Sequence, residues 1–149
     1  MIKIQKQKFS CEKVINQIKS NIKIGAIVSF QGYVRDFDNS KNDNILELNI
    51  EHYDGMTQKA IERIELLARK KWRLEEIVII HRFGRLTIND LIVLVVVASA
   101  HRGEAFEACR YIIDSLKIHV PFWKKEISEK KSKWVKQKKS DLLRPNLSN

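Results

Sequence analysis

The chain has 149 residues, of which 44% are hydrophobic and 31% are charged, which is ordinary for a soluble globular protein. A chain of this length can bury about 68–70% of its unfolded surface, so we expect one domain with a real core. Its longest apolar run, residues 91–98, is far shorter than the roughly 20 residues of a membrane helix, and the amino terminus lacks the apolar stretch of a signal peptide, so we expect a cytoplasmic protein.

The amino-terminal part predicts a helix, a strand and a polar loop. Ser10 is placed to cap a helix that ends near Asn21. Residues 24–34 place Val28 and Phe30 on one face and polar neighbours on the other, which predicts a strand. The loop that follows, residues 36–44, is rich in Asn and Asp and is expected to be flexible.

A second strand and a second helix follow this loop. Residues 45–52 alternate apolar and polar side chains, which predicts a half-buried antiparallel strand. Asp54 and Gly55 indicate a turn, after which Thr57 is placed to cap a helix that ends near Trp72.

The next segments contain the longest apolar run and the longest helix. Residues 77–80 predict a short strand, and turn signals occupy residues 83–86 and 89–90. Residues 91–98 are rich in β-branched side chains, as in a strand that is covered on both faces. Apolar residues then recur at helical spacing over residues 102–117.

Pro121 ends this helix, and two short strands are predicted after it, at residues 122–126 and near Trp134. Strands adjacent in sequence tend to pair antiparallel, so this order predicts an α+β domain with mainly antiparallel strands. We expect residues 1–149 to form this single domain, with a disordered tail from about residue 136.

The two cysteines, Cys11 and Cys109, give no sign of a disulfide or a zinc site. They are far apart, neither belongs to a CxxC pair, and a cytosolic chain would keep both reduced. Cys109 lies on the apolar face of a predicted helix and is expected to be a small buried hydrophobe. Cys11 begins a helix, where a thiolate could be stabilised, but no histidine is near it in sequence.

Most of the net charge of +10 lies in the last quarter of the chain. Residues 117–149 contain ten basic and three acidic side chains, a net charge of +7. Such a segment favours an anionic partner, which could be a phosphorylated small molecule, an acidic protein surface or a nucleic acid. The alternative, a solvated tail that only keeps the protein soluble, is sufficient for most of residues 130–139.

His101 and Arg102 form the first candidate site. They stand where a buried strand stops and a helix begins, and helix N-termini attract anions. A His and an Arg would strengthen a phosphate or carboxylate site there, and Gly103 would let a ligand approach the backbone. The alternative is a solvated helix start.

Lys117 and Lys124 form the second candidate. Lys117 ends the long helix, where a cation also simply suits the dipole. Lys124 follows Phe122 and Trp123, and a lysine beside apolar rings can act as acid, base or nucleophile, although core packing is the commoner reason for such a pair of rings. Arg35, at the end of a predicted strand, could reach a ligand or could equally lie on the surface.

The remaining histidines and motifs add no chemistry. His52, His81 and His119 lack a Ser, Cys or metal-ligand partner at useful spacing, and we expect His81 and His119 to be ordinary surface or core residues. The sequence has no Walker A loop, no GxGxxG and no HExxH. The residues alone therefore predict an α+β protein with a basic site that binds anions, without naming a reaction.

Several segments together resemble one family, the large subunit of molybdopterin synthase. The most specific are EHYDGM at residues 51–56, SAHR at residues 99–102 and PFWKKE at residues 121–126. GAIVSFQGYVR at residues 25–35, IHRFG at residues 80–84 and AFEA at residues 105–108 also match, in the family's order and spacing.

This resemblance implies an α/β-hammerhead fold with a small additional β subdomain. It implies a homodimer whose outer ends each bind a small ubiquitin-like subunit, which makes a heterotetramer. The partner carries sulfur as a thiocarboxylate on its C-terminal Gly-Gly tail, and two rounds of transfer to cyclic pyranopterin monophosphate (precursor Z) form the dithiolene of molybdopterin. The family needs no metal and binds no cofactor of its own, and a catalytic cysteine is not needed because the sulfur arrives on the partner.

The resemblance also assigns site residues. Lys117 and Lys124 match the catalytic lysines, with Lys117 expected beside the thiocarboxylate carbonyl to polarise it or to shuttle protons, and Lys124 expected to hold the substrate or the partner tail. His101 and Arg102 are expected to act across the dimer interface. The positions that match substrate-binding or pocket residues are Arg35, His101, Arg102, Phe30 and Glu126.

Two other functions compete with this one. A nucleic-acid-binding module would explain the net charge and predicts steeply salt-dependent binding, but Trp134 is the only aromatic residue within the basic tail. A non-catalytic adaptor for a ubiquitin-like protein would tolerate the loss of Lys117 and Lys124. If the chain is the enzyme, its basic tail could seat an acidic face of the small subunit.

Overall fold

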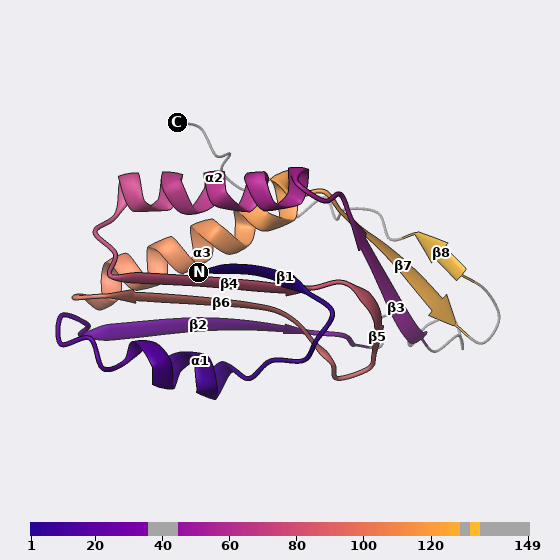
Figure 1. Cartoon of the computed structure of the whole chain (residues 1–149), viewed down its shortest axis with the longest axis horizontal. Helices are drawn as coiled ribbons and strands as arrows, with labels where there is room; N and C mark the ends of the chain where they lie inside the picture. Colours follow the sequence, from indigo (N-terminus) through magenta and orange to yellow (C-terminus); the bar gives the residue numbers. More distant parts are fainter. Residues whose placement is uncertain (36–44, 129–131, 135–149) are drawn as a thin grey trace.

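The computed structural model describes residues 1–35, 45–128 and 132–134, and within these residues it contains three helices and two four-stranded sheets (Figure 1). The expected α+β class with mainly antiparallel strands is confirmed. The expectations of a flexible loop over residues 36–44 and of a disordered tail after about residue 136 lie outside the described residues.

The first sheet has the strand order β1-β4-β6-β2. Its strands are β1 (Ile2–Gln5), β2 (Ala26–Tyr33), β4 (Glu76–Arg82) and β6 (Leu91–Ser99). Strand β1, which the sequence analysis missed, pairs parallel with β4, and the Met1 amino group donates to the Ile77 carbonyl at 2.7 Å. The other pairs are antiparallel.

Helices cover both faces of this sheet. Helices α2 (Met56–Lys71) and α3 (Arg102–His119) lie on one face, and the shorter α1 (Cys11–Ile18) lies on the other (Figure 1). Alternate residues of β4 and β6 therefore enter two separate cores, which explains the continuous apolar run of residues 91–98. Each large apolar side chain fully buried in this way contributes about 1.5–3 kcal/mol.

The second sheet projects from one end of the first, at the right in Figure 1, with the strand order β5-β3-β7-β8. Its strands are β3 (Ile45–His52), β5 (Gly84–Thr87), β7 (Phe122–Ser128) and β8 (Ser132–Trp134), all antiparallel. A third core joins the two sheets, and its fully or nearly fully buried members are Val34, Leu48, Ile50, Leu86 and Ile92.

Two local predictions were wrong. Residues 83–86, expected to be a turn, bend only at Gly84, where φ is 86°, and the chain then pairs with β3 and buries Leu86 completely. Thr57 does not cap α2; Gly55 is the N-cap at a φ of 79°, and Thr57 is buried inside the first turn. A positive φ is easiest for glycine, so backbone freedom outweighs a side-chain cap here.

The other helix ends lie close to the expected positions, and the largest difference is that α1 ends at Ile18 and not near Asn21. Ser10 caps α1 and its hydroxyl accepts a hydrogen bond from the Lys13 amide at 3.4 Å. Helix α3 begins at Arg102 as expected and runs two residues past Lys117 to His119. None of the helices in the described ranges is long and apolar enough to cross a membrane.

Candidate functional site

Helix α3 separates the two predicted basic clusters. His101 is its N-cap residue and Lys117 lies in its last turn. At about 1.5 Å of rise per residue these two positions are roughly 24 Å apart along the helix axis. In Figure 1 the helix runs from one end of the first sheet to the other. Within one chain, therefore, the two clusters cannot contact the same small ligand.

The end of α3 that carries Lys117 leads into β7, and β2 ends on the same side of the first sheet (Figure 1). Lys117 is exposed, and Arg35, which follows β2, is exposed as well. On β7, Lys124 is half-buried and Glu126 is only 8% exposed. The fold thus brings four of the predicted residues to one end of the molecule, where three basic groups would attract an anion.

Strand alternation decides which β7 side chains face inward. Lys124 lies opposite Ile50 of β3, and Glu126 lies opposite Leu48, and both of these partners are core residues. Trp123 and Lys125 alternate with them and so point to the other face of the sheet. Lys124 and Glu126 consequently share a face, and Lys125 is a natural control residue on the opposite one.

Two histidines line the inner side of the strand that carries Lys124. The His81 ring stacks on Phe122 with centroids 3.7 Å apart and an interplanar angle of 13°. The His52 ring lies 6.2 Å from the same phenyl ring and packs edge-on against Phe83 at 4.4 Å. The sequence analysis assigned neither histidine to the site, although each stands at or next to the end of a predicted strand, which is the signal that could have found them.

His81 is buried and uncharged. Its Nδ1 lies 2.8 Å from the Arg82 carbonyl, so Nδ1 carries the hydrogen that this carbonyl accepts. The pKa of His81 is lowered from 6.5 to about 3, mainly by burial. The hydrogen bond with the Arg82 carbonyl opposes this shift, and the charges of Lys124 and His52 add smaller lowering contributions. The imidazole therefore stays neutral at physiological pH although it is polar and close to a lysine.

Phe30 lies on the same face of the first sheet as His81. Val28, which shares its face of β2, packs into the core under α2 and α3, as does Ile79 of β4. A Cβ at Gly32 would come within 2.7 Å of Val93 Cγ1 and would touch the Phe30 ring at 3.4 Å, so glycine makes room chiefly for Val93 beside this ring. At 36% exposure, Phe30 can still offer an apolar surface to a ligand.

The opposite end of α3 carries His101 and Arg102, both exposed. The His101 side chain makes no capping hydrogen bond, and its backbone amide donates to the Ser99 hydroxyl at 3.5 Å. Gly25 anchors this turn, because its amide donates to the Ser99 carbonyl at 3.0 Å and any Cβ would collide with the Ala100 carbonyl. The turn is therefore held firmly while its two basic side chains reach outward.

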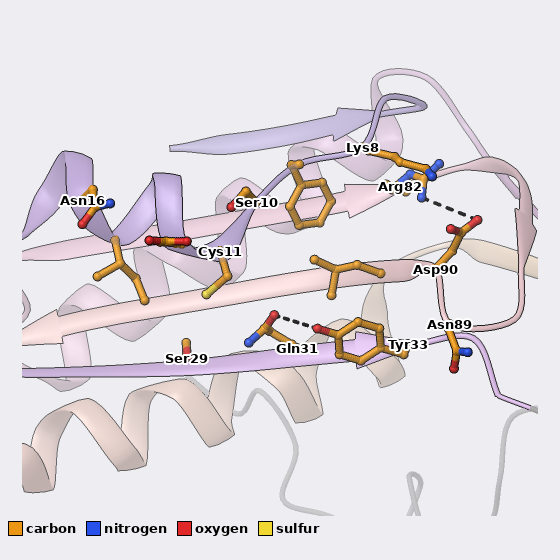
Figure 2. A pocket seen from close by; sticks show the side chains of 14 residues that line it. Lys8, Ser10, Cys11, Asn16, Ser29, Gln31, Tyr33, Arg82, Asn89 and Asp90 are labelled. Carbon is orange, nitrogen blue, oxygen red and sulfur yellow. Dashed lines mark hydrogen bonds and ion pairs between the residues drawn. The ribbon is translucent and has the colours of Figure 1, made fainter.

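A separate cavity of about 770 Å³ lies between α1 and the first sheet (Figure 2). Arg82 crosses it, with Nε donating to the Lys6 carbonyl at 3.0 Å and a terminal nitrogen 3.9 Å from Asp90. The Thr87 amide, which donates to Asp90, lowers the pKa of that carboxyl. These contacts hold the turn before β6, and none of the predicted site residues lines this cavity.

The expectation that Cys109 is a small buried residue is confirmed. Cys109 is 5% exposed, and burial raises the pKa of its thiol to about 11, which suits a core residue and not a nucleophile. Cys11 is half-buried and free. In the described ranges, no three His, Cys, Asp or Glu side chains gather as metal ligands.

Comparison with known proteins shows a consistent set of relatives. A family model described as MoaE protein matches residues 4–119. The molybdopterin synthase catalytic subunit of Vibrio cholerae is 41% identical over 140 residues, which cover 94% of this chain and 92% of that one.

Two solved structures share the fold. A MoaE protein of molybdopterin biosynthesis from Burkholderia ambifaria superposes with a TM-score of 0.80 at 37% identity and covers 95% of both chains. A molybdopterin synthase from Staphylococcus aureus gives a TM-score of 0.82 at 36% identity, covering 90% of this chain and 96% of that one. The hammerhead fold expected from the sequence motifs is the fold of these proteins.

Proposed function

The chain belongs to the MoaE protein family, and we propose from this membership that Lys117 and Lys124 carry its chemistry. It works as the catalytic subunit of a molybdopterin synthase, a sulfurtransferase of molybdenum cofactor biosynthesis. The observation that supports the site is the connection of α3 to β7, which brings the elements of both lysines to one end of the molecule, where β2, which precedes Arg35, also ends.

The two lysines have different surroundings and therefore different proposed roles. Lys117 is exposed in the last turn of α3, where it can approach the thiocarboxylate of an incoming partner tail and stabilise charge on its carbonyl oxygen. Lys124 is half-buried on the inner face of β7, and its fixed surroundings suit a group that holds the pterin phosphate or the tail. Glu126 and Phe30 would line the same pocket.

His101 and Arg102 are proposed to complete the site of a second copy of the chain. The length of α3 keeps them about 24 Å from Lys117 of their own chain, so they can serve the same ligand only across a dimer. A homodimer with two such shared sites, each engaged by a small ubiquitin-like subunit, would be the working assembly.

The sulfur is proposed to come from the partner. The thiol of Cys109 is buried and poorly ionised, so it is a poor carrier of transferable sulfur. A thiocarboxylate on the small subunit would deliver one sulfur per encounter, and two encounters per pterin would make the dithiolene. We also place this reaction in the cytoplasm, where both cysteines would stay reduced.

The test is product formation from precursor Z and thiocarboxylated small subunit, with molybdopterin measured as its oxidised fluorescent derivative. Wild type, Lys117→Ala, Lys124→Ala and the opposite-face control Lys125→Ala are compared. We expect Lys117→Ala to lose nearly all turnover and Lys125→Ala to keep it. No turnover by the wild type with intact partner binding would make the chain an adaptor. Without partner binding, oligonucleotide binding is the next measurement.

A further inference from the structure

Three rings pack together where the strand that carries Lys124 begins. Phe122 lies in the middle, with the His81 ring flat against it at 3.7 Å and the His52 ring tilted against it at 6.2 Å. His81 comes from the end of β4 in the first sheet, and His52 comes from the end of β3 in the second. The stack therefore joins the two sheets at the point where β7 begins.

Phe122 and Lys124 share a face of β7. The two residues are neighbours on one face of β7, about 7 Å apart along the strand. The Phe122 amide donates to the Val120 carbonyl at 2.9 Å, which makes the connection through Pro121 a tight one. Fixing the phenyl ring thus fixes the first residues of β7 and the direction in which the lysine leaves the backbone.

The orientation of the His81 ring is itself fixed. Its Nδ1–H donates to the Arg82 carbonyl at 2.8 Å, and its neighbours in the adjacent strands, Ile4 of β1 and Val93 of β6, are apolar. The charged or titratable groups that act on it are Lys124 and His52. A ring held in this way presents a flat, uncharged face to Phe122 and places no second cation beside the lysine.

His52 supports the other side of the stack. Its side chain is 9% exposed, it lies opposite Phe122 in the β3–β7 pairing, and it packs against Phe83. Its Nδ1 is buried without a hydrogen-bond partner in the described part of the chain, and its Nε2 lies 3.7 Å from the exposed Asp54.

We propose that His81 is a positioning residue for Lys124, acting through its stack on Phe122, and that His52 braces the same phenyl ring from the second sheet. The importance of this arrangement for catalysis rests on the role proposed above for Lys124. The arrangement itself, a lysine held in place by a ring stack, can be tested without any turnover.

Two substitutions test the ring of His81 and its hydrogen bond one at a time. His81→Phe keeps a flat ring against Phe122 but cannot donate to the Arg82 carbonyl. His81→Asn can donate to that carbonyl but removes the ring. If the stack positions Lys124, this lysine keeps its wild-type position and reactivity in His81→Phe and loses them in His81→Asn.

The first readout is the rate at which a limiting amount of acetic anhydride modifies each lysine of the purified full-length chain, measured by fragment-ion mass spectrometry. We expect His81→Asn to change the rate at Lys124 at least threefold and to leave the rate at Lys125 unchanged. We expect His81→Phe to keep the Lys124 rate within a factor of two of the wild type. Circular dichroism confirms that each variant is folded, and His52→Asn, which removes the other ring that packs on Phe122, replaces His81→Asn if the latter is not.

The second readout is steady-state turnover of the assembled synthase. A displaced Lys124 raises KM for the pterin substrate in His81→Asn by about tenfold with a smaller change in kcat, and His81→Phe restores KM. An unchanged Lys124 labelling rate in a folded His81→Asn variant would overturn the proposal. An equal change in the labelling rate of Lys125 would also overturn it, because the whole strand would then have loosened. If labelling responds but KM does not, the stack positions the lysine and the role proposed for Lys124 is wrong.

Discussion

The buried neutral His81 makes the stability of this protein depend on pH in a specific way. Its pKa is about 3 in the folded chain and 6.5 when unperturbed, so between these values the unfolded chain binds a proton that the folded chain does not. The contribution of His81 to the free energy of unfolding is therefore fully present above pH 6.5 and is lost as the pH falls towards 3. Each pH unit below 6.5 costs about 1.4 kcal/mol, which makes the loss at pH 5 about 2 kcal/mol relative to pH 8.

Other groups also titrate over this range, so the contribution of His81 needs a reference variant. His81→Phe keeps a ring on Phe122 and has no ionisation at this position. Urea denaturation of both proteins at pH 8 and pH 5 gives the change in the free energy of unfolding for each. We expect the wild type to lose about 2 kcal/mol more than the variant between the two pH values. Equal losses, within about 0.5 kcal/mol, would show that His81 is not held neutral and would refute the reasoning.

Three further predictions concern the dimer, the turn before α3 and the basic tail. Chains with His101→Ala and chains with Lys117→Ala are each expected to be inactive alone. In an equal mixture, mixed dimers regain one intact site, which gives roughly a quarter of wild-type activity. No regain of activity would argue against a shared site. Gly25→Ala should lower the melting temperature by several degrees, because its Cβ would collide with the Ala100 carbonyl. Scanning calorimetry measures this change, and Gly103→Ala is the control because a Cβ there meets open space. Charge reversal in the basic tail should weaken binding of the small subunit in titration calorimetry, and unchanged affinity would exclude the tail from that interface; the residues to change are Lys136, Lys138 and Lys139.

The parts of the fold that were predictable carry a strong local signal. The apolar run of β6 and the helical period of α3 were located almost to the residue, because burial on both faces and a 3.6-residue period leave clear patterns. Strand β1 was missed because its four residues become a strand only through parallel pairing with β4, which lies far along the chain. Strand β5 was missed because Gly84 next to Phe83 is equally typical of a turn.

The candidate site also has a part that the sequence predicted and a part that it could not predict. The sequence resemblance pointed to Lys117 and Lys124, and the fold brings their elements together. The ring stack could not be predicted, because His81, Phe122 and His52 are far apart in the sequence and no spacing rule connects them. The separation of His101 from Lys117, by contrast, follows from helix length alone and was available from the predicted bounds of α3.

The position of the polar residues within β4 shows why the site lies where it does. Ile77, Ile79 and His81 follow one another on one face of this strand. The two isoleucines lie under α2 and α3, where a polar group would be buried without a partner, whereas His81 lies one step further, against β7 of the second sheet. At the position of His81 the first sheet is covered by β7, which carries Lys124, and no longer by the helices. There the imidazole can donate to a backbone carbonyl and stack on the Phe122 ring. The proposed site thus lies at the junction of the two sheets, where a polar side chain finds partners that the helix-covered part of the first sheet does not offer.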